Sequence, residues 1–167
     1  MAAKKSSRES DRELIITRVF DAPRALVWKA WTDPAELVKW WGPKGFTTTT
    51  QEIDVRPGGV WRHVMHGPDG SDFPHQLVFV EIAEPLRLVY EHVGGEVQFR
   101  TIVTFSEQNG ATEVTMRMIF ESAAELRRVD EKYGAIRGAE EMIERLGEHA
   151  LALCASAVHS EVDFTRR

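Results

Sequence analysis

The dipeptide Asn109-Gly110 lies between two runs in which apolar and polar residues alternate. Asn-Gly is a strong signal for a two-residue hairpin turn, because both central positions need positive φ angles that these residues tolerate. If Gln108 pairs with Ala111, one face of the hairpin carries seven apolar residues and one threonine: Phe99, Thr101, Val103, Phe105, Val114, Met116, Met118 and Phe120. A shift by one residue would turn this apolar set into water, so the pattern predicts one buried and one solvated face.

The region before the hairpin also has the pattern of short strands. Runs rich in β-branched and aromatic residues are separated by turn signals such as Pro57-Gly58-Gly59 and Gly94-Gly95. Such spacing is typical of an antiparallel meander. The predicted strand regions are approximately 46–55, 59–66, 73–82, 86–93 and 97–120, the last being the two strands of the hairpin.

Helical patterns flank the meander on both sides. After a first strand at Glu13–Phe20, two short helices are expected, separated at Asp33-Pro34 because a residue before proline avoids the helical region. Ser122 with Glu125 three residues later predicts a capped helix before Gly134. Beyond Gly134, an apolar stripe at helical spacing predicts a long helix that covers the buried sheet face: Ile136, Ala139, Met142, Ile143, Leu146, Ala150 and Leu153. The expected fold class is α+β, with a curved antiparallel sheet wrapped around a long C-terminal helix.

Length and charge limit the class of protein. A chain of 167 residues fits a single domain, expected at 13–158, with a disordered N-terminal tail at 1–12 and a loose C-terminal tail at 159–167. No apolar run approaches a membrane span or a signal peptide, and the net charge of −5 argues against a nucleic-acid partner. The single cysteine, Cys154, is compatible with a reducing compartment, so a cytoplasmic protein is expected.

Three segments carry a resemblance to a known family: VFDAPRALVWKAWTDPAELVKWWGP, GGVWRHVMHGPDG and LRLVYEH. They resemble the family related to the activator of heat-shock protein 90 ATPase, within the START-like and birch-pollen-allergen-like group. The resemblance extends from about Glu13 to Leu153 and implies the helix-grip fold. Members of the larger group include lipid carriers, polyketide cyclases and antibiotic-resistance proteins, so the resemblance predicts the fold but leaves the activity open.

The strand at 60–66 supplies the first candidate site residues. Alternation places Trp61, His63 and Met65 on its inward face. His63 and His66 do not form a metal pair, because residues three apart on a strand project to opposite faces, and no metal site is expected. His63 is interpreted either as a core histidine with a hydrogen-bond partner or as a ligand contact.

Other inward positions extend this candidate site. Leu86, Leu88, Tyr90 and His92 share a face by alternation. Trp40-Trp41 should lie near the cavity mouth, where the chain leaves the short helices, with at most one of the two lining the space. The same residues would also make a filled core, whereas the resemblance favours a cavity between helix and sheet. The predicted ligand-binding residues are Trp41, Trp61, His63, Met65, Tyr90, Thr101, Met116, Met118 and Met142.

Three functions follow from these observations. The first is binding of a small hydrophobic or aromatic ligand in the cavity. The second is a cyclase or hydrolase in which His63 or Tyr90 transfers a proton, although the sequence has no nucleophile elbow, Walker loop or dinucleotide-binding motif, so no catalytic residue or cofactor is predicted. The third is a co-chaperone that stimulates a heat-shock protein 90, which rests on the family resemblance alone and is not favoured. A homodimer through an edge strand or an exposed tryptophan stays open.

Overall fold

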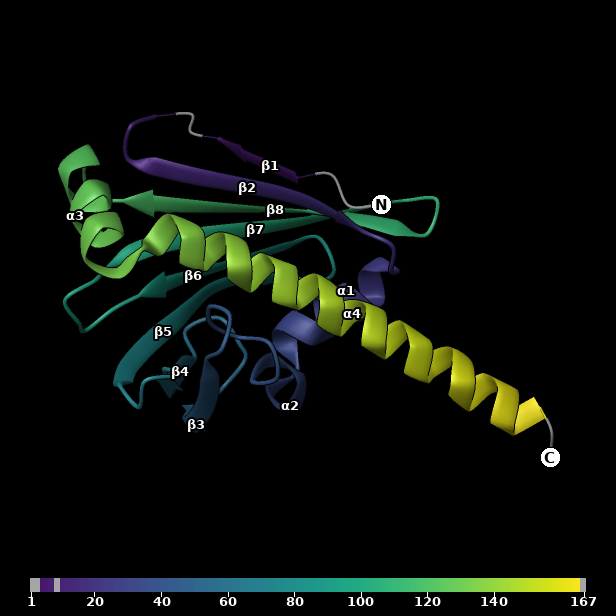
Figure 1. The fold of residues 1–167 in the computed structure, drawn as a ribbon. Coiled ribbons are helices and arrows are strands. Elements are labelled where there is room, and N and C mark those ends of the chain that lie inside the picture. The colour runs from purple at the N-terminus through teal and green to yellow at the C-terminus, as the bar shows by residue number, and fades with distance from the viewer. Residues whose placement is uncertain (1–3, 8–9, 166–167) are drawn as a thin grey trace.

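The computed structural model describes the backbone of residues 4–7 and 10–165 and the side chains of residues 10–156. One antiparallel sheet of eight strands has the order β1-β2-β8-β7-β6-β5-β4-β3 and curves around the helix α4 (Figure 1). The strands are β1 Lys4–Ser7, β2 Glu13–Phe20, β3 Thr47–Ile53, β4 Val60–His66, β5 Asp72–Ala83, β6 Arg87–His92, β7 Phe99–Gln108 and β8 Ala111–Phe120. This is the helix-grip fold that the sequence predicts.

The register predicted from Asn109-Gly110 is confirmed. Gln108 pairs with Ala111, and the pairing continues without a shift to Phe99 opposite Phe120. Both turn residues have positive φ, 55° at Asn109 and 78° at Gly110, as the two-residue turn requires. The predicted apolar face is buried along its length, with only Phe99 partly exposed at its end.

The helices are α1 Arg24–Thr32, α2 Pro34–Leu37, α3 Ala123–Tyr133 and α4 Ala135–Thr165. Ser122 caps α3 as predicted, because its Oγ accepts a hydrogen bond from the Glu125 backbone N–H at 3.0 Å. The long helix α4 crosses the concave side of the sheet (Figure 1) and buries the predicted stripe residues Ala139, Ile143, Leu146 and Ala150.

Gly147 shows why α4 can lie so close to the sheet. A Cβ atom at this position would lie 2.4 Å from the Phe20 ring. A glycine in a helix interior costs up to about 1 kcal/mol relative to alanine. Here the glycine allows the helix backbone to contact an aromatic ring of β2, so the intrinsic cost is offset by packing.

The structure corrects the expectations at three places. Lys4–Ser7 lie in the region expected to be a disordered tail, but their backbone groups pair with β2 and complete its outer edge. Helix α4 continues to Thr165 and so includes most of the expected C-terminal tail. Leu86 does not share the inward face of β6, because it lies in the turn before the strand and is 53% exposed.

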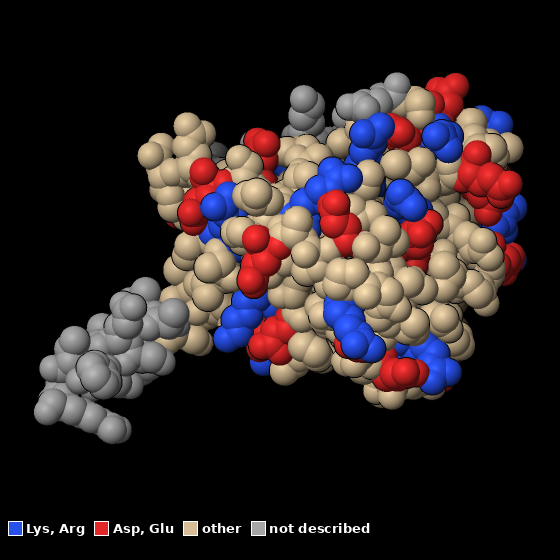
Figure 2. Space-filling view, turned by 180° about the vertical axis from the view of Figure 1, so that it is seen from behind, with Lys and Arg blue, Asp and Glu red and all other residues tan. Residues whose placement is uncertain are grey.

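The convex side of the sheet carries charges of both signs. Lys and Arg side chains are interspersed with Asp and Glu over the face shown in Figure 2. Outward-facing pairs on neighbouring strands account for part of this pattern, including Arg87 with Glu81 at 2.6 Å and Arg100 with Glu91 at 3.5 Å. In the described part of the chain, no helix has the length and apolar character needed to cross a membrane.

Candidate functional site

Tryptophans fill one end of the space between the sheet and α4. Trp28 and Trp31, from α1, pack edge-on against Phe105, with ring centroids 5.1 and 5.9 Å apart. Trp40 packs against Trp31 at 4.9 Å and donates its indole N–H to the backbone oxygen of Ala30 at 2.8 Å. These side chains are buried, and this end of the space is a closed core.

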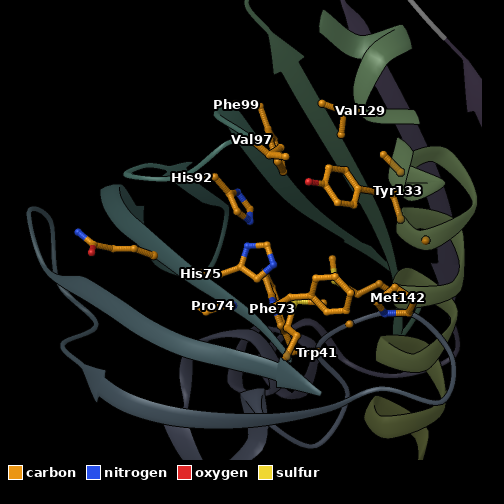
Figure 3. Close-up of a pocket in the computed structure, with 18 of the residues that line it drawn as sticks. Trp41, Phe73, Pro74, His75, His92, Val97, Phe99, Val129, Tyr133 and Met142 are labelled. Carbon is orange, nitrogen blue, oxygen red and sulfur yellow. The ribbon is translucent and has the colours of Figure 1, made fainter. Parts of the chain in front are cut away.

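The other end of the space is a cavity of about 570 Å³. Its floor is the concave face of β5 to β8, and its roof is the junction of α3 and α4 (Figure 3). The roof combines the larger residues Val129, Tyr133 and Met142 with four small ones, Gly134, Ala135, Gly138 and Ala139. Short side chains at the crossing leave the volume between helix and sheet unfilled. A volume of this size is typical of a small-molecule site.

Seven of the nine residues predicted to bind a ligand line this cavity: Trp41, Met65, Tyr90, Thr101, Met116, Met118 and Met142. They come from the loop after α2, from four strands and from α4. Of the two adjacent tryptophans, Trp41 lines the cavity, while Trp40 belongs to the closed core. Both side chains are buried, and only Trp41 borders the cavity.

Trp61 and His63 are placed differently from the prediction. Both are fully buried and neither lines the cavity. The Trp41 ring lies against both, with centroids 4.9 Å from Trp61 and 6.0 Å from His63, while Trp61 and His63 stack on each other at 3.8 Å. The inward direction was predicted correctly, but a side chain from the loop after α2 covers the strand, and local alternation cannot reveal this.

Two further histidines, His75 and His92, line the cavity and were not predicted as site residues. His75 pairs across the sheet with His63, and the two rings stack at 5.6 Å. His92 lies 5.9 Å from His75 and stacks on Phe99 at 4.1 Å (Figure 3). Alternation along the predicted strand 73–82 could have identified His75, because it shares a face with Phe73 and Leu77.

Burial keeps this row of histidines uncharged. It lowers the pKa of His63 to about 3, an effect to which neighbouring His75 adds. Burial likewise lowers the pKa of His75, and it lowers the pKa of His92 well below the ordinary value, with smaller effects of His75 and His63. At neutral pH each ring is therefore a neutral imidazole, with one nitrogen that donates a hydrogen bond and one that accepts.

Tyr90 and Thr101 add hydroxyl groups to the floor, on neighbouring positions of β6 and β7. Burial raises the pKa of the Tyr90 phenol, an effect that the nearby Thr101 hydroxyl and Trp31 oppose only in part. Tyr90 therefore remains a neutral phenol. The Thr101 Oγ is buried and makes no hydrogen bond of ordinary geometry with the described residues.

The loop between β6 and β7 closes one side of the cavity. Glu96 at its tip accepts a hydrogen bond from the Tyr133 hydroxyl at 2.7 Å and forms ion pairs with Arg128, at 3.2 Å, and with Lys132. These partners, chiefly Lys132 and Tyr133, lower the pKa of Glu96 to about 2. The group, hereafter the Glu96 latch, connects residues 93–98 to α3.

Arg145, on α4, fixes the loop at residues 41–43 on the opposite side of the cavity. Its guanidinium donates hydrogen bonds to the backbone oxygens of Gly42 and Pro43 at 2.9 and 3.0 Å, and to that of Trp41 at 3.3 Å. The guanidinium is therefore directed from α4 at the loop carbonyls. Arg145 thus fixes the loop that positions the Trp41 ring between the cavity and Trp61.

The histidine row is not a metal site in this geometry. Among the described side chains, no group of three His, Cys, Asp or Glu residues is arranged to hold a metal ion. The ring centroids along the row are 5.6 and 5.9 Å apart, which suits ring packing. The chemistry that these residues offer is hydrogen bonding by neutral groups inside an apolar wall.

Fold and site together place the protein among the helix-grip, START-like domains. More narrowly, the chain belongs to the Activator of Hsp90 ATPase homolog 1-like protein family, which matches residues 21–150. None of the curated proteins matches the chain.

Solved bacterial structures share the fold. A Mycobacterium smegmatis protein is 28% identical, with a TM-score of 0.78 over 89% of this chain and 98% of that one. A Nitrosomonas europaea protein is 25% identical, with a TM-score of 0.79 over 89% and 99%. An Arthrobacter aurescens protein, 24% identical with a TM-score of 0.83 over 89% and 91%, shows the likeness in fold alone.

Proposed function

We propose that the protein binds a small hydrophobic or aromatic ligand in the cavity between α4 and the sheet. The observation that carries the proposal is the cavity of about 570 Å³, which is open on one side and bordered by the sheet, the α3–α4 junction and the Trp41 loop. The apolar part of its wall lacks packing partners, so it is suited to a ligand that supplies them.

The composition of the wall supports this class of ligand. The wall includes several aromatic rings and thioethers: Trp41, Phe73, Phe99, Met116, Met118 and Met142. Methionine side chains adapt their shape and make favourable contacts with aromatic rings. Burial of an apolar ligand against such a wall contributes about 25 cal/mol per Å² of apolar surface removed from water.

Thermal unfolding with a panel of aromatic compounds and fatty acids tests the proposal. A ligand at 100 times its dissociation constant should stabilise the protein by about 2.7 kcal/mol and raise Tm by several degrees. Met142→Trp should place an indole in the cavity and abolish the shift. Leu151→Trp is the matched control, because Leu151 lies on the same helix and is 48% exposed. If no compound raises Tm, or Met142→Trp binds as well as the wild type, the proposal fails.

The other two functions considered from the sequence have separate tests. A proton-transfer role for His63 requires contact with a substrate, whereas its ring is fully buried beneath Trp41. The structure therefore lends no support to that version of an enzyme. An ATPase assay with a heat-shock protein 90 directly tests the activity that the family's description mentions.

A further inference from the structure

The cavity has a polar centre inside its apolar wall. His75 and His92 face the space from β5 and β6, and Thr101 lies beside them on β7 (Figure 3 shows the two histidines). The Nδ1 atom of His92 is buried and has no hydrogen-bond partner among the described residues, and the buried Oγ atom of Thr101 has no bond of ordinary geometry there apart from its interaction with the Tyr90 hydroxyl. Thr101 as a whole is only 1% exposed. Buried polar atoms without partners cost free energy. Both ring nitrogens of His63 are also unpartnered but lie outside the cavity, whereas His92 and Thr101 border the space in which a ligand can supply hydrogen bonds.

The charged residues around the cavity are already engaged at its rim. Arg62 pairs with Glu52 on the outer side of the sheet, and Asp72 pairs with His66 at 2.7 Å. Glu96 belongs to the latch described above. Within the described part of the wall, the polar centre therefore consists of neutral groups, and no cation is placed to balance a ligand carboxylate there.

We infer that the ligand is an uncharged aromatic compound that carries a hydroxyl or carbonyl group, held by His92, His75 and Thr101. This inference rests on the proposed function and specifies its ligand class. The neutral imidazoles and the threonine hydroxyl can each donate or accept a hydrogen bond, so a phenol can be satisfied in either role. A carboxylate buried here would lose its hydration without gaining an ion pair.

The rings around the polar centre favour an aromatic scaffold. His92 stacks on Phe99 at an interplanar angle of 19°, whereas His75 stands nearly perpendicular to His92, at 86°. A small polar group can approach the edges of both imidazoles while the attached ring packs against Phe73 and Met142, which face them in Figure 3. Aromatic pairs favour such offset and edge-on contacts.

Three probes that share one scaffold test the inference: biphenyl, 4-phenylphenol and biphenyl-4-carboxylate. Their dissociation constants should be measured at pH 7.5 by calorimetry or by tryptophan fluorescence. We expect 4-phenylphenol to bind about tenfold more tightly than biphenyl, the effect of one or two net hydrogen bonds. The carboxylate should bind more weakly than either.

Histidine variants locate the preference. His92→Phe keeps the stacking on Phe99 and removes the nitrogen atoms, so it should reduce the preference for the phenol to less than threefold while biphenyl still binds. His66→Phe is the matched control, because His66 is a histidine on the rim that pairs with Asp72 and Thr49. This control should leave the preference unchanged.

Each result bears on a different statement. If none of the three probes binds, the proposed function itself loses its support, and this inference falls with it. If biphenyl binds as tightly as the phenol, or the carboxylate binds best, ligand binding stands and the neutral polar subsite is wrong. If His92→Phe does not fold, the imidazole ¹⁵N spectrum of the wild-type protein provides the test instead. 4-Phenylphenol should shift the His92 nitrogen resonances, and biphenyl should not. If the two compounds give the same spectrum, the inference is overturned.

Discussion

The two ends of the space beneath α4 share a sheet and a helix but are filled in opposite ways. At the closed end, Trp28 and Trp31 descend from α1 and pack against Phe105, and Trp40, from the segment after α2, packs against Trp31. At the open end, Tyr133 and Met142 reach down from α3 and α4, but the small residues Gly138 and Ala139 between them leave a cavity of about 570 Å³. The residues that the helices place above the sheet therefore differ between the end that is core and the end that is hollow.

The ends also differ in their polar groups. At the closed end, the polar atom of Trp40 is satisfied by a backbone oxygen. At the open end, His92 and Thr101 retain unsatisfied atoms, and so does the ring of His63 beneath Trp41. A core without partners for such atoms would lose stability, whereas a binding site can exchange that loss for affinity and specificity.

The largest expected effect is at the closed end. Trp31→Ala should reduce the free energy of unfolding by about 3–5 kcal/mol, because it leaves a large void in a packed core. Met142→Ala, at the open end, should cost less than half as much, because Met142 is half-buried and already borders a cavity. Urea denaturation of both variants measures the difference, and equal losses would contradict the distinction between the two ends.

Acid should destabilise the protein through the histidine row. The pKa of folded His63 is about 3, below the 6.5 of an exposed histidine, so protonation favours the unfolded chain. The contribution of His63 to the free energy of unfolding is fully present above pH 6.5 and declines as the pH falls towards 3. Between pH 6.5 and 4.5 the free energy of unfolding should fall by about 2–3 kcal/mol. His63→Phe should lose correspondingly less stability over that interval. The free energy of unfolding of both proteins should be measured by urea denaturation between pH 6.5 and 4.5. If both lose the same amount, the prediction for His63 is wrong.

Adding volume should distinguish the ends again. Ala30→Met enlarges a fully buried residue in α1 and should cost about 1–3 kcal/mol through overpacking. Ala139→Met extends into the cavity and should change stability by less than about 1 kcal/mol while it weakens ligand binding. Thermal unfolding together with ligand titration tests the pair, and a severe loss of stability in Ala139→Met would show that the cavity cannot accept a side chain.

The smallest effect on stability is expected at the Glu96 latch. Glu96→Gln removes the ion pairs to Arg128 and Lys132, which are exposed and screened by salt, so Tm should change little. The local effect should be faster amide hydrogen exchange at residues 93–98, because the loop is less firmly attached to α3. Glu140→Gln on α4 serves as the control. Unchanged exchange in Glu96→Gln would mean that the latch does not hold the loop.

Much of the fold could be predicted from local patterns. The Asn109-Gly110 turn set the register of the hairpin to its last pair, and the Asp33-Pro34 boundary separated the two short helices. The candidate site was predicted less completely. Trp61 and His63 were correctly assigned to the inward face, but only the contact with the Trp41 ring removes them from the cavity wall.

The sequence by itself determined which face of each strand turns inward and which stripe of α4 covers it, because alternation and helical period are local properties of the chain. The tertiary structure alone decided that one end of the covered face is filled and the other hollow. That outcome depends on which residues from α1, the Trp41 loop and the α3–α4 junction meet above the sheet. It also brought His75 and His92 together from separate strands, because cross-strand proximity depends on a register that spans the whole meander.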